Sequence, residues 1–220
     1  MCAPPPICLF GSSRITGPPT RTASGALGFA AGASDDWQTC PSAWAALAPH
    51  VRKYAAKRVW QPFYYDGKCA EHLRELGFSD VVHEKWDFFE RVKDKKFLKK
   101  VDVIMDNPPY TSPETKEAVL GALAASGKPF IMLLPISVLH VAFVRRLLDM
   151  RRVQALIPRR VLVRKRNAQS PVPFKYLCWL AYKCDLDSDL IFLDDKNDGE
   201  ENDDAEDVRA ARCGGGGKER

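Results

Sequence analysis

Long apolar runs and a cysteine framework are both missing from this 220-residue sequence. No stretch of about 18 consecutive apolar residues occurs, so no membrane span is expected. The start has no basic region ahead of an apolar stretch, which argues against a secretory signal. The seven cysteines are scattered and include no Cys-x-x-Cys pair, so neither a disulfide framework nor a metal site is indicated. Reduced thiols favour an intracellular protein, cytoplasmic or nuclear. Arginines among Ser, Thr and Ala before residue 35 leave organelle targeting open.

Charge is distributed unevenly along the chain. Residues 51–187 hold 26 Lys and Arg against 15 Asp and Glu, a net +11, whereas residues 188–220 hold 5 against 11, a net −6. A basic middle segment fits a nucleic-acid partner, because phosphate neutralisation supplies most of the affinity for nucleic acid, although basic surfaces also serve solubility. Composition predicts a disordered head at 1–48, one domain at 49–187 and an acidic, glycine-ended disordered tail at 188–220.

Strands that alternate with helices predict an α/β fold with a doubly wound, mostly parallel sheet. The expected strands are 58–63, 80–84, 101–106, 128–135, 153–158 and 175–183, and the expected helices are 68–76, 113–125 and 140–150. Basic and apolar residues interleave between 159 and 166, which suits an edge strand or hairpin with one face towards phosphate. The cations concerned are Arg159, Arg160, Arg164, Lys165 and Arg166, and a merely solvated edge is the alternative.

The most informative stretch is an apolar strand that runs straight into Asn107-Pro108-Pro109-Tyr110. Two prolines fix two φ angles and remove two N–H donors, so the strand must end in a stiff corner. Ser112 is a good N-cap and Pro113 suits the first helical position, so a helix follows. Such strand-to-helix loops are where open α/β sheets bind ligands. An Asn-Pro-x-Tyr docking peptide is the alternative, but such peptides belong in disordered tails.

The corner resembles the catalytic motif of S-adenosylmethionine-dependent amino-methyltransferases, most closely the adenine-specific DNA amino-methyltransferase family. The resemblance implies a class I methyltransferase-like fold with a C-terminal antiparallel strand beside the parallel set. It also implies that the Asn107 side-chain carbonyl and the Pro108 backbone carbonyl accept the hydrogens of an exocyclic amino group. Pro108 and Pro109 would aim these acceptors, and Tyr110 would stack on the flipped base.

The same resemblance assigns a cofactor site, although the usual glycine-rich loop after the first strand is missing. A subset of adenine amino-methyltransferases is similar, with an aromatic-Asp-Gly turn instead. By that similarity Asp66 and Gly67 flank the methionine end of S-adenosylmethionine, and Glu84 takes the ribose hydroxyls. Asp87 accepts from the cofactor's adenine amino group, and Phe88 packs on its ring. The alternatives are an ordinary Asp-Gly turn and core packing.

On the substrate side, Phe174 lies in a Pro-Phe pair before an apolar strand and would close on the base opposite Tyr110, with core packing as the alternative. The expected activity is methyl transfer to the amino group of adenine in DNA. The same corner serves enzymes that methylate RNA bases or protein glutamine amides, and a nucleic-acid-binding module without cofactor binding is a further alternative. A domain this small leaves little room for target recognition, so a homodimer or a partner protein is expected to assist.

Overall fold

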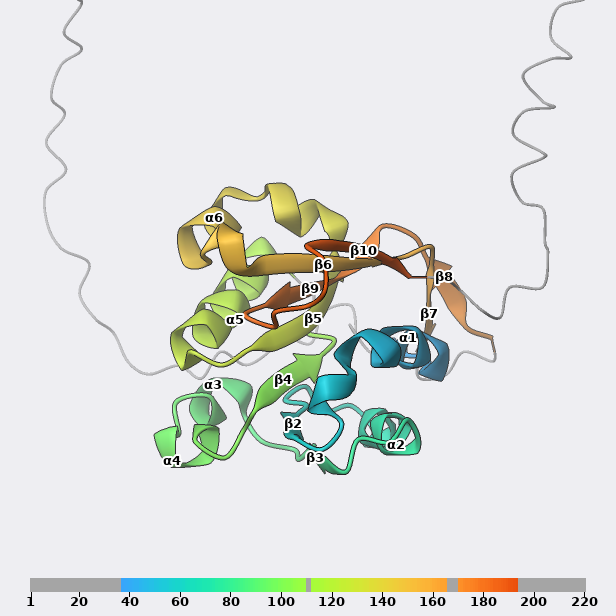
Figure 1. Cartoon of the computed structure of the whole chain (residues 1–220), viewed down its shortest axis with the longest axis horizontal. Helices are drawn as coiled ribbons and strands as arrows, with labels where there is room; N and C mark the ends of the chain where they lie inside the picture. The colour runs from blue at the N-terminus through green and yellow to red at the C-terminus, as the bar shows by residue number, and fades with distance from the viewer. Residues whose placement is uncertain (1–36, 110–111, 166–169, 194–220) are drawn as a thin grey trace, which may run out of the picture. The chain divides into compact units, whose positions relative to one another are not determined.

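A seven-stranded sheet forms the centre of the computed structural model, which describes residues 37–109, 112–165 and 170–193 (Figure 1). The strand order is β10-β6-β9-β5-β4-β2-β3. The strands are β2 Arg58–Trp60, β3 Asp80–Val82, β4 Val103–Asp106, β5 Phe130–Pro135, β6 Val153–Pro158, β9 Leu177–Tyr182 and β10 Leu190–Leu193. All neighbouring strands are parallel except in the two pairs made by β9, which lies between β5 and β6. The expected α/β, mostly parallel sheet with an inserted antiparallel strand is thereby confirmed.

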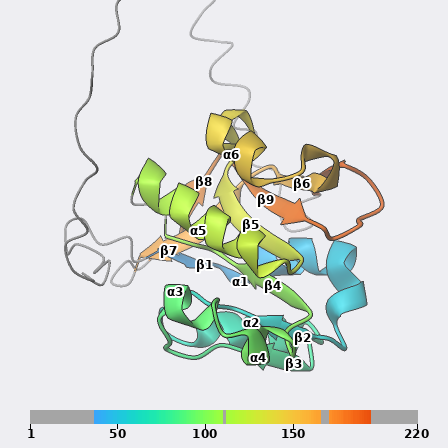
Figure 2. The same ribbon diagram turned by 90° about the vertical axis from the view of Figure 1, so that its left-hand side faces the viewer.

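Helices cover both faces of this sheet, as Figures 1 and 2 show from two directions. The helices are α1 Pro41–Leu47, α2 Lys68–Glu75, α3 Phe88–Arg91, α4 Lys95–Leu98, α5 Pro113–Ser126 and α6 Ala142–Leu147, with 3-10 helices at Ala48–Tyr54, Ile136–His140 and Met150–Arg152. One core contains Trp44 of α1 and Leu73 of α2, and the other contains Leu120 of α5 and Val144 of α6. Within the described ranges, no helix is long and apolar enough to cross a membrane.

A second sheet of three strands, called the small sheet below, has the order β1-β7-β8. It consists of β1 Trp37–Thr39, β7 Val161–Lys165 and β8 Val172–Phe174. Both pairs are antiparallel, with Thr39 opposite Val163 and Val163 opposite Val172. The expected disordered head at 1–48 is therefore wrong for residues 37–48, which form β1 and α1. Composition misled here, because Trp44, Leu47 and Val51 follow a helical spacing and are each at most 1% exposed.

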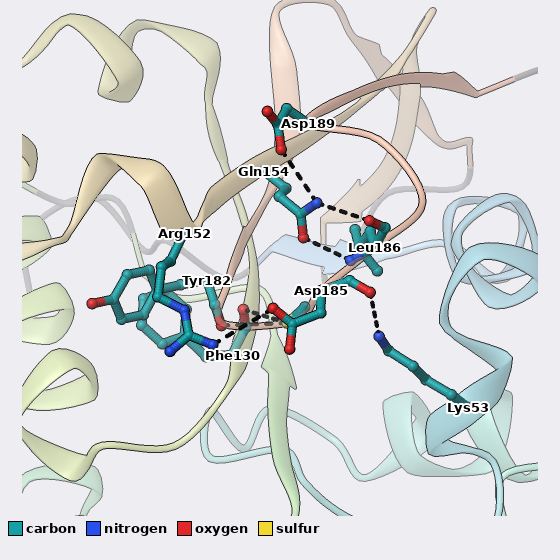
Figure 3. Close-up of polar contacts among 9 residues, drawn as sticks. Lys53, Phe130, Arg152, Gln154, Tyr182, Asp185, Leu186 and Asp189 are labelled. Carbon is teal, nitrogen blue, oxygen red and sulfur yellow. Dashed lines mark hydrogen bonds and ion pairs between the residues drawn. The ribbon is translucent and has the colours of Figure 1, made fainter.

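The expected domain end at residue 187 is also wrong, because residues 190–193 form β10, which runs parallel to β6. The connection from β9 to β10 is fastened by Gln154, whose amide is almost buried (Figure 3). Its Nε2 donates to the carbonyls of Leu186 and Ser188 at 3.0 and 3.1 Å, and its Oε1 accepts from Leu186 N at 2.8 Å. Lys53 Nζ donates to the Asp185 carbonyl. These bonds satisfy backbone groups of the turn before β10 and so hold this edge strand in place. The acidic residues around β10 had made the segment look like part of a disordered tail.

Candidate functional site

The Asn-Pro-Pro corner lies at the carboxyl end of β4, a strand in the interior of the sheet. Asn107 and Pro109 are half-buried and Pro108 is buried; Tyr110 lies outside the described residues. The helix after the corner begins as expected, because Ser112 Oγ accepts from Thr115 N at 3.1 Å and Pro113 is its first residue. The expected order of strand, corner and helix is confirmed.

Asp106, the last residue of β4, ties the corner to the loop that follows β2. Its carboxylate is 1% exposed; Oδ2 accepts from Phe63 N at 2.6 Å and Oδ1 from Asn107 N at 2.8 Å. Burial raises the pKa of this carboxyl to about 8, and the hydrogen bonds from Phe63 and Asn107 oppose the rise. Sequence reasoning overlooked Asp106, although an acidic residue inside an apolar strand was a visible signal.

Two side chains of β1 contact residues expected to form the site. Asn107 Nδ2 donates to Thr39 Oγ1 at 2.9 Å, and Thr39 is 1% exposed. The adjacent Gln38 donates from Nε2 to both oxygens of Asp66, at 3.0 and 3.1 Å. Because Gln38 and Thr39 are consecutive, one strand links the corner to the loop after β2. The Thr39 bond also restrains the plane of the Asn107 amide. Neither residue was expected, since both fell in the presumed head.

Asp66 and Gly67 form the turn that begins α2. Asp66 Oδ1 accepts from Lys68 N at 3.0 Å. This bond is typical of an ordinary Asp-Gly turn, which was the alternative to a cofactor role for Asp66. Gly67 has φ +89°, a backbone conformation that L side chains rarely adopt. The Asp-Gly turn therefore starts α2 and keeps the Asp66 carboxylate beside Gln38.

The side-chain amide of Gln61, the residue just after β2, is buried without a hydrogen-bond partner among the described residues. Gln61 is fully buried, and among the described residues neither its Nε2 nor its Oε1 makes a hydrogen bond. The backbone of Gln61 continues the hydrogen bonding between β2 and β3, because Gln61 N donates to the Val82 carbonyl at 2.9 Å. Since side chains alternate along a strand, Gln61 points to the same face as Val59, which lies in one core with Met105 of β4. An unpaired buried amide costs about 1–3 kcal/mol, so it requires an explanation.

His83 lies beside Gln61 at the end of β3. Its Nδ1 is 2.9 Å from the Gln61 carbonyl, and its ring stacks on Tyr64 with centroids 5.0 Å apart. Burial lowers the pKa of His83, while the bond to the Gln61 carbonyl opposes that shift. The neutral ring thus braces the loops after β2 and β3 against each other.

The remaining cofactor residues lie on the loop after β3 and at the start of α3. Glu84 and Asp87 are exposed, and Asp87 Oδ1 caps α3 by accepting from Glu90 N at 2.9 Å. Phe88 is only 6% exposed and packs against Trp60 and Phe63, with ring centroids 6.0 and 5.0 Å away. Its ring belongs to the core, which was the stated alternative. The cofactor roles of these three residues stay predictions.

The residues expected to bind substrate lie on the small sheet and on the loop before it. Phe174 is 38% exposed and meets Trp37 edge to face, with centroids 5.2 Å apart. Arg159, Arg164 and Lys165 are exposed and Arg160 is half-buried, whereas Arg166 lies outside the described residues. Arg159 and Arg160 follow β6. Arg164 and Lys165 are consecutive at the end of β7, so they point to opposite faces of the small sheet.

Comparison with known proteins adds little to this geometry. No protein-family model matches the chain, and no curated protein matches it significantly. Among solved structures, the crystal structure of Thermoplasma acidophilum 1320 is similar with a TM-score of 0.40 and 12% identity, over 64% of this chain and 87% of that one. A resemblance this weak carries no inference about function.

Replacing the buried carboxyl should remove a pH dependence of stability. The ordinary pKa of Asp106 is 3.8 and its folded pKa is about 8, so between these values the folded protein keeps a proton that the unfolded chain has lost. Its contribution is therefore present below about pH 4 and is lost as the pH rises towards 8. Asp106→Asn does not titrate and sets an amide NH₂ against a backbone N–H, so we expect it to be less stable by about 1–3 kcal/mol at pH 5.

Urea denaturation at pH 5, 6.5 and 8 measures this effect. The unfolding free energy of the wild type minus that of Asp106→Asn should be largest at pH 5 and should fall by about 1.4 kcal/mol per pH unit, so that the variant becomes the more stable protein before pH 8. A difference that stays constant or widens with pH would show that the folded carboxyl is ionised throughout this range.

Proposed function

We propose that this protein is an S-adenosylmethionine-dependent methyltransferase that acts on the exocyclic amino group of adenine in DNA. The observation that carries the proposal is the Asn107-Pro108-Pro109 corner at the end of β4, held on one side by Thr39 and on the other by Asp106. A half-buried amide followed by two prolines, fixed from both directions, is an arrangement of preorganised hydrogen-bond acceptors.

The position of the corner supports a ligand site there. The chain goes from β2 to β3 on one side of β2, and then returns to place β4 on its other side. The strand order thus reverses between β2 and β4, and in open α/β sheets ligands bind at such a switch point, outside the carboxyl ends of the strands. Asp66 and Asn107 follow these two strands. The insertion of antiparallel β9 between β5 and β6 supports the finer assignment to a class I methyltransferase-like fold.

The residues around this switch point fit S-adenosylmethionine. Gln61 offers a buried amide that has both a donor and an acceptor to give, and Asp66 offers a carboxylate near the start of α2. Acidic side chains at 66, 84 and 87 suit a cofactor that bears an ammonium and a sulfonium group. Gly67 and its neighbours replace the glycine-rich loop. When bound, S-adenosylmethionine supplies an electrophilic methyl group.

The chain's own residues would activate the amino group. Asn107 Oδ1 and the Pro108 carbonyl oxygen each accept one amino hydrogen, which draws the nitrogen lone pair out of conjugation with the ring. Thr39 keeps the Asn107 amide in the orientation that presents Oδ1, because it binds the opposite end, Nδ2. The Pro-Pro backbone keeps the Pro108 carbonyl in place without reorganisation. Asp106 holds the loops after β2 and β4 together and does not contact the substrate in this proposal, since both of its oxygens already accept hydrogen bonds from backbone N–H groups.

Basic residues support nucleic acid as the acceptor. Arg159, Arg164 and Lys165 are exposed, and the segment 51–187 carries a net +11. Phosphate neutralisation by such groups supplies most of the affinity for DNA. In this proposal Tyr110 and Phe174 hold the target base.

Calorimetric titration with S-adenosylmethionine, followed by transfer of tritiated methyl groups, tests the function. We expect saturable binding and transfer to DNA. Asn107→Ala should keep cofactor binding and lose at least about 100-fold in transfer rate, because one preorganised acceptor is removed. Absence of binding would favour a nucleic-acid-binding module instead. Transfer to RNA alone or to protein alone would reassign the acceptor.

The Thr39 hydroxyl should matter to the rate and little to cofactor binding. Thr39→Val keeps the side-chain shape but cannot accept from Asn107 Nδ2, so we expect kcat to fall about ten-fold. Thr39→Ser keeps a hydroxyl and is the matched control, with a rate close to that of the wild type. Equal rates for the valine and serine variants would contradict a positioning role for the Thr39 hydroxyl.

Gln61 should lower the stability of the free protein and raise its affinity for the cofactor. Gln61→Met removes an unpaired buried amide, so we expect unfolding free energy to rise by about 1 kcal/mol while cofactor affinity falls about ten-fold. Gln154→Met is the matched control, because the Gln154 amide is fully engaged: it should lose stability and keep its affinity. Stability from urea denaturation and affinity from calorimetry give both readouts. Unchanged affinity in Gln61→Met would remove Gln61 from the cofactor site.

A further inference from the structure

The strands of the small sheet, with the loop before β7 and the residues after β8, hold several cations. In the described residues 37–40, 159–165 and 170–176 there are five cations and no Asp or Glu. The five are Arg159, Arg160, Arg164, Lys165 and Lys175. The Asp66 carboxylate contacts Gln38 of β1, but cations outnumber acidic groups here, and an excess of cations attracts an anionic partner.

Exposed aromatic and aliphatic groups lie among these cations. Trp37 and Phe174 form an edge-to-face pair, and Lys165 Nζ lies 5.8 Å from the centre of the Trp37 ring. Val172 is 43% exposed and Tyr176 is 78% exposed. Cations that alternate with ring faces are the composition of surfaces that bind unpaired bases and their phosphates together.

This surface is continuous with the candidate site. Trp37 and Thr39 alternate with Gln38 along β1, so they point to one face of the small sheet, and Thr39 on that face contacts Asn107. Phe174 and Val172 lie on the same face through their pairing with Val161 and Val163. Thr39, Val161 and Val163 on this face are at most 2% exposed, so a bound chain would contact only the exposed rim, where Trp37, Lys165, Val172 and Phe174 lie.

Tyr176 extends the surface towards β5. Its carbonyl accepts from Ile136 N at 2.8 Å, just beyond the end of β5, and β5 neighbours β4. Its φ of +65° is unfavourable for a bulky L residue. Backbone strain of this kind persists where surrounding structure enforces it, and it is common at ligand sites. Here the strained backbone holds an aromatic ring out into solvent just beyond the end of β5.

We propose that the small sheet binds a single-stranded polynucleotide, with Trp37 stacking on a base that flanks the target, Phe174 beside it at the target base, and Lys165, on the same face as Trp37, facing a phosphate. Stacking on side chains requires bases whose faces are open, and a duplex hides those faces. The inference deepens the proposed function, on which it rests for the reaction at the neighbouring corner. The binding itself needs neither cofactor nor methyl transfer, so it can be measured separately.

Fluorescence anisotropy with the full-length protein and no cofactor tests the proposal. The probe is a labelled 20-nucleotide DNA, compared as a single strand and as a duplex of the same sequence. We expect the single strand to bind at least about ten-fold more tightly. Trp37→Ala and Phe174→Ala should each weaken single-strand binding about ten-fold, as loss of one stacked base does. Lys165→Ala should reduce the slope of log K against log salt by about 0.7.

Phe192→Ala is the matched control, because Phe192 is an aromatic residue 70% exposed on β10, outside the small sheet. It should bind like the wild type. Trp37→Phe keeps an aromatic ring, so it should retain most of the affinity for the single strand. If it does, the weaker binding of Trp37→Ala is due to the lost ring and not to misfolding. Equal or tighter duplex binding, or alanine variants at 37 and 174 that bind like Phe192→Ala, would overturn the proposal. If the protein binds the single strand as expected but transfers no methyl group, the proposed enzymatic function is rejected and the proposed binding surface is supported.

Discussion

The carboxyl group of Asp106 joins the two loops between which the candidate site lies. It accepts one backbone N–H from Phe63, after β2, and one from Asn107, after β4. These strands are neighbours at the point where the chain order of the sheet reverses. Without a group that accepts from both loops, each would leave a buried N–H unpaired, and an Asn-Pro-Pro corner cannot rearrange to compensate because its φ angles are fixed.

Burial of the Asp106 carboxyl disfavours its ionised form, and this is why its pKa is raised. Gln61, on the strand beside it, has a comparable cost because its amide lacks partners among the described residues. Both side chains lie at the carboxyl ends of adjacent strands, where the proposed ligand site lies. Among the described residues, buried polar atoms without a partner also occur at Trp44 Nε1 of α1 and His72 Nδ1 of α2, so burial of this kind does not by itself mark a site.

The small sheet gives the corner its second support. Thr39 reaches Asn107 across 68 positions of sequence, and Gln38 beside it reaches Asp66. One short strand therefore contacts both the residue proposed for catalysis and the loop proposed for the cofactor. The same strand carries Trp37, so the surface proposed for a single strand and the corner proposed for chemistry share a backbone.

The sequence by itself determined the strand, corner and helix around Asn107, because two prolines, the Ser112 cap and the apolar run are local signals. It also indicated the mostly parallel sheet with an antiparallel strand, since helical and strand periodicities alternate along the chain. It misplaced both ends of the domain: composition concealed the helical spacing of Trp44, Leu47 and Val51, and acidic neighbours concealed β10. Only the tertiary structure decided that Thr39 holds Asn107, that Asp106 joins two loops and that the Gln61 side-chain amide has no hydrogen-bond partner among the described residues. These facts depend on hydrogen bonds between residues distant in sequence, and no local propensity or spacing encodes such pairings.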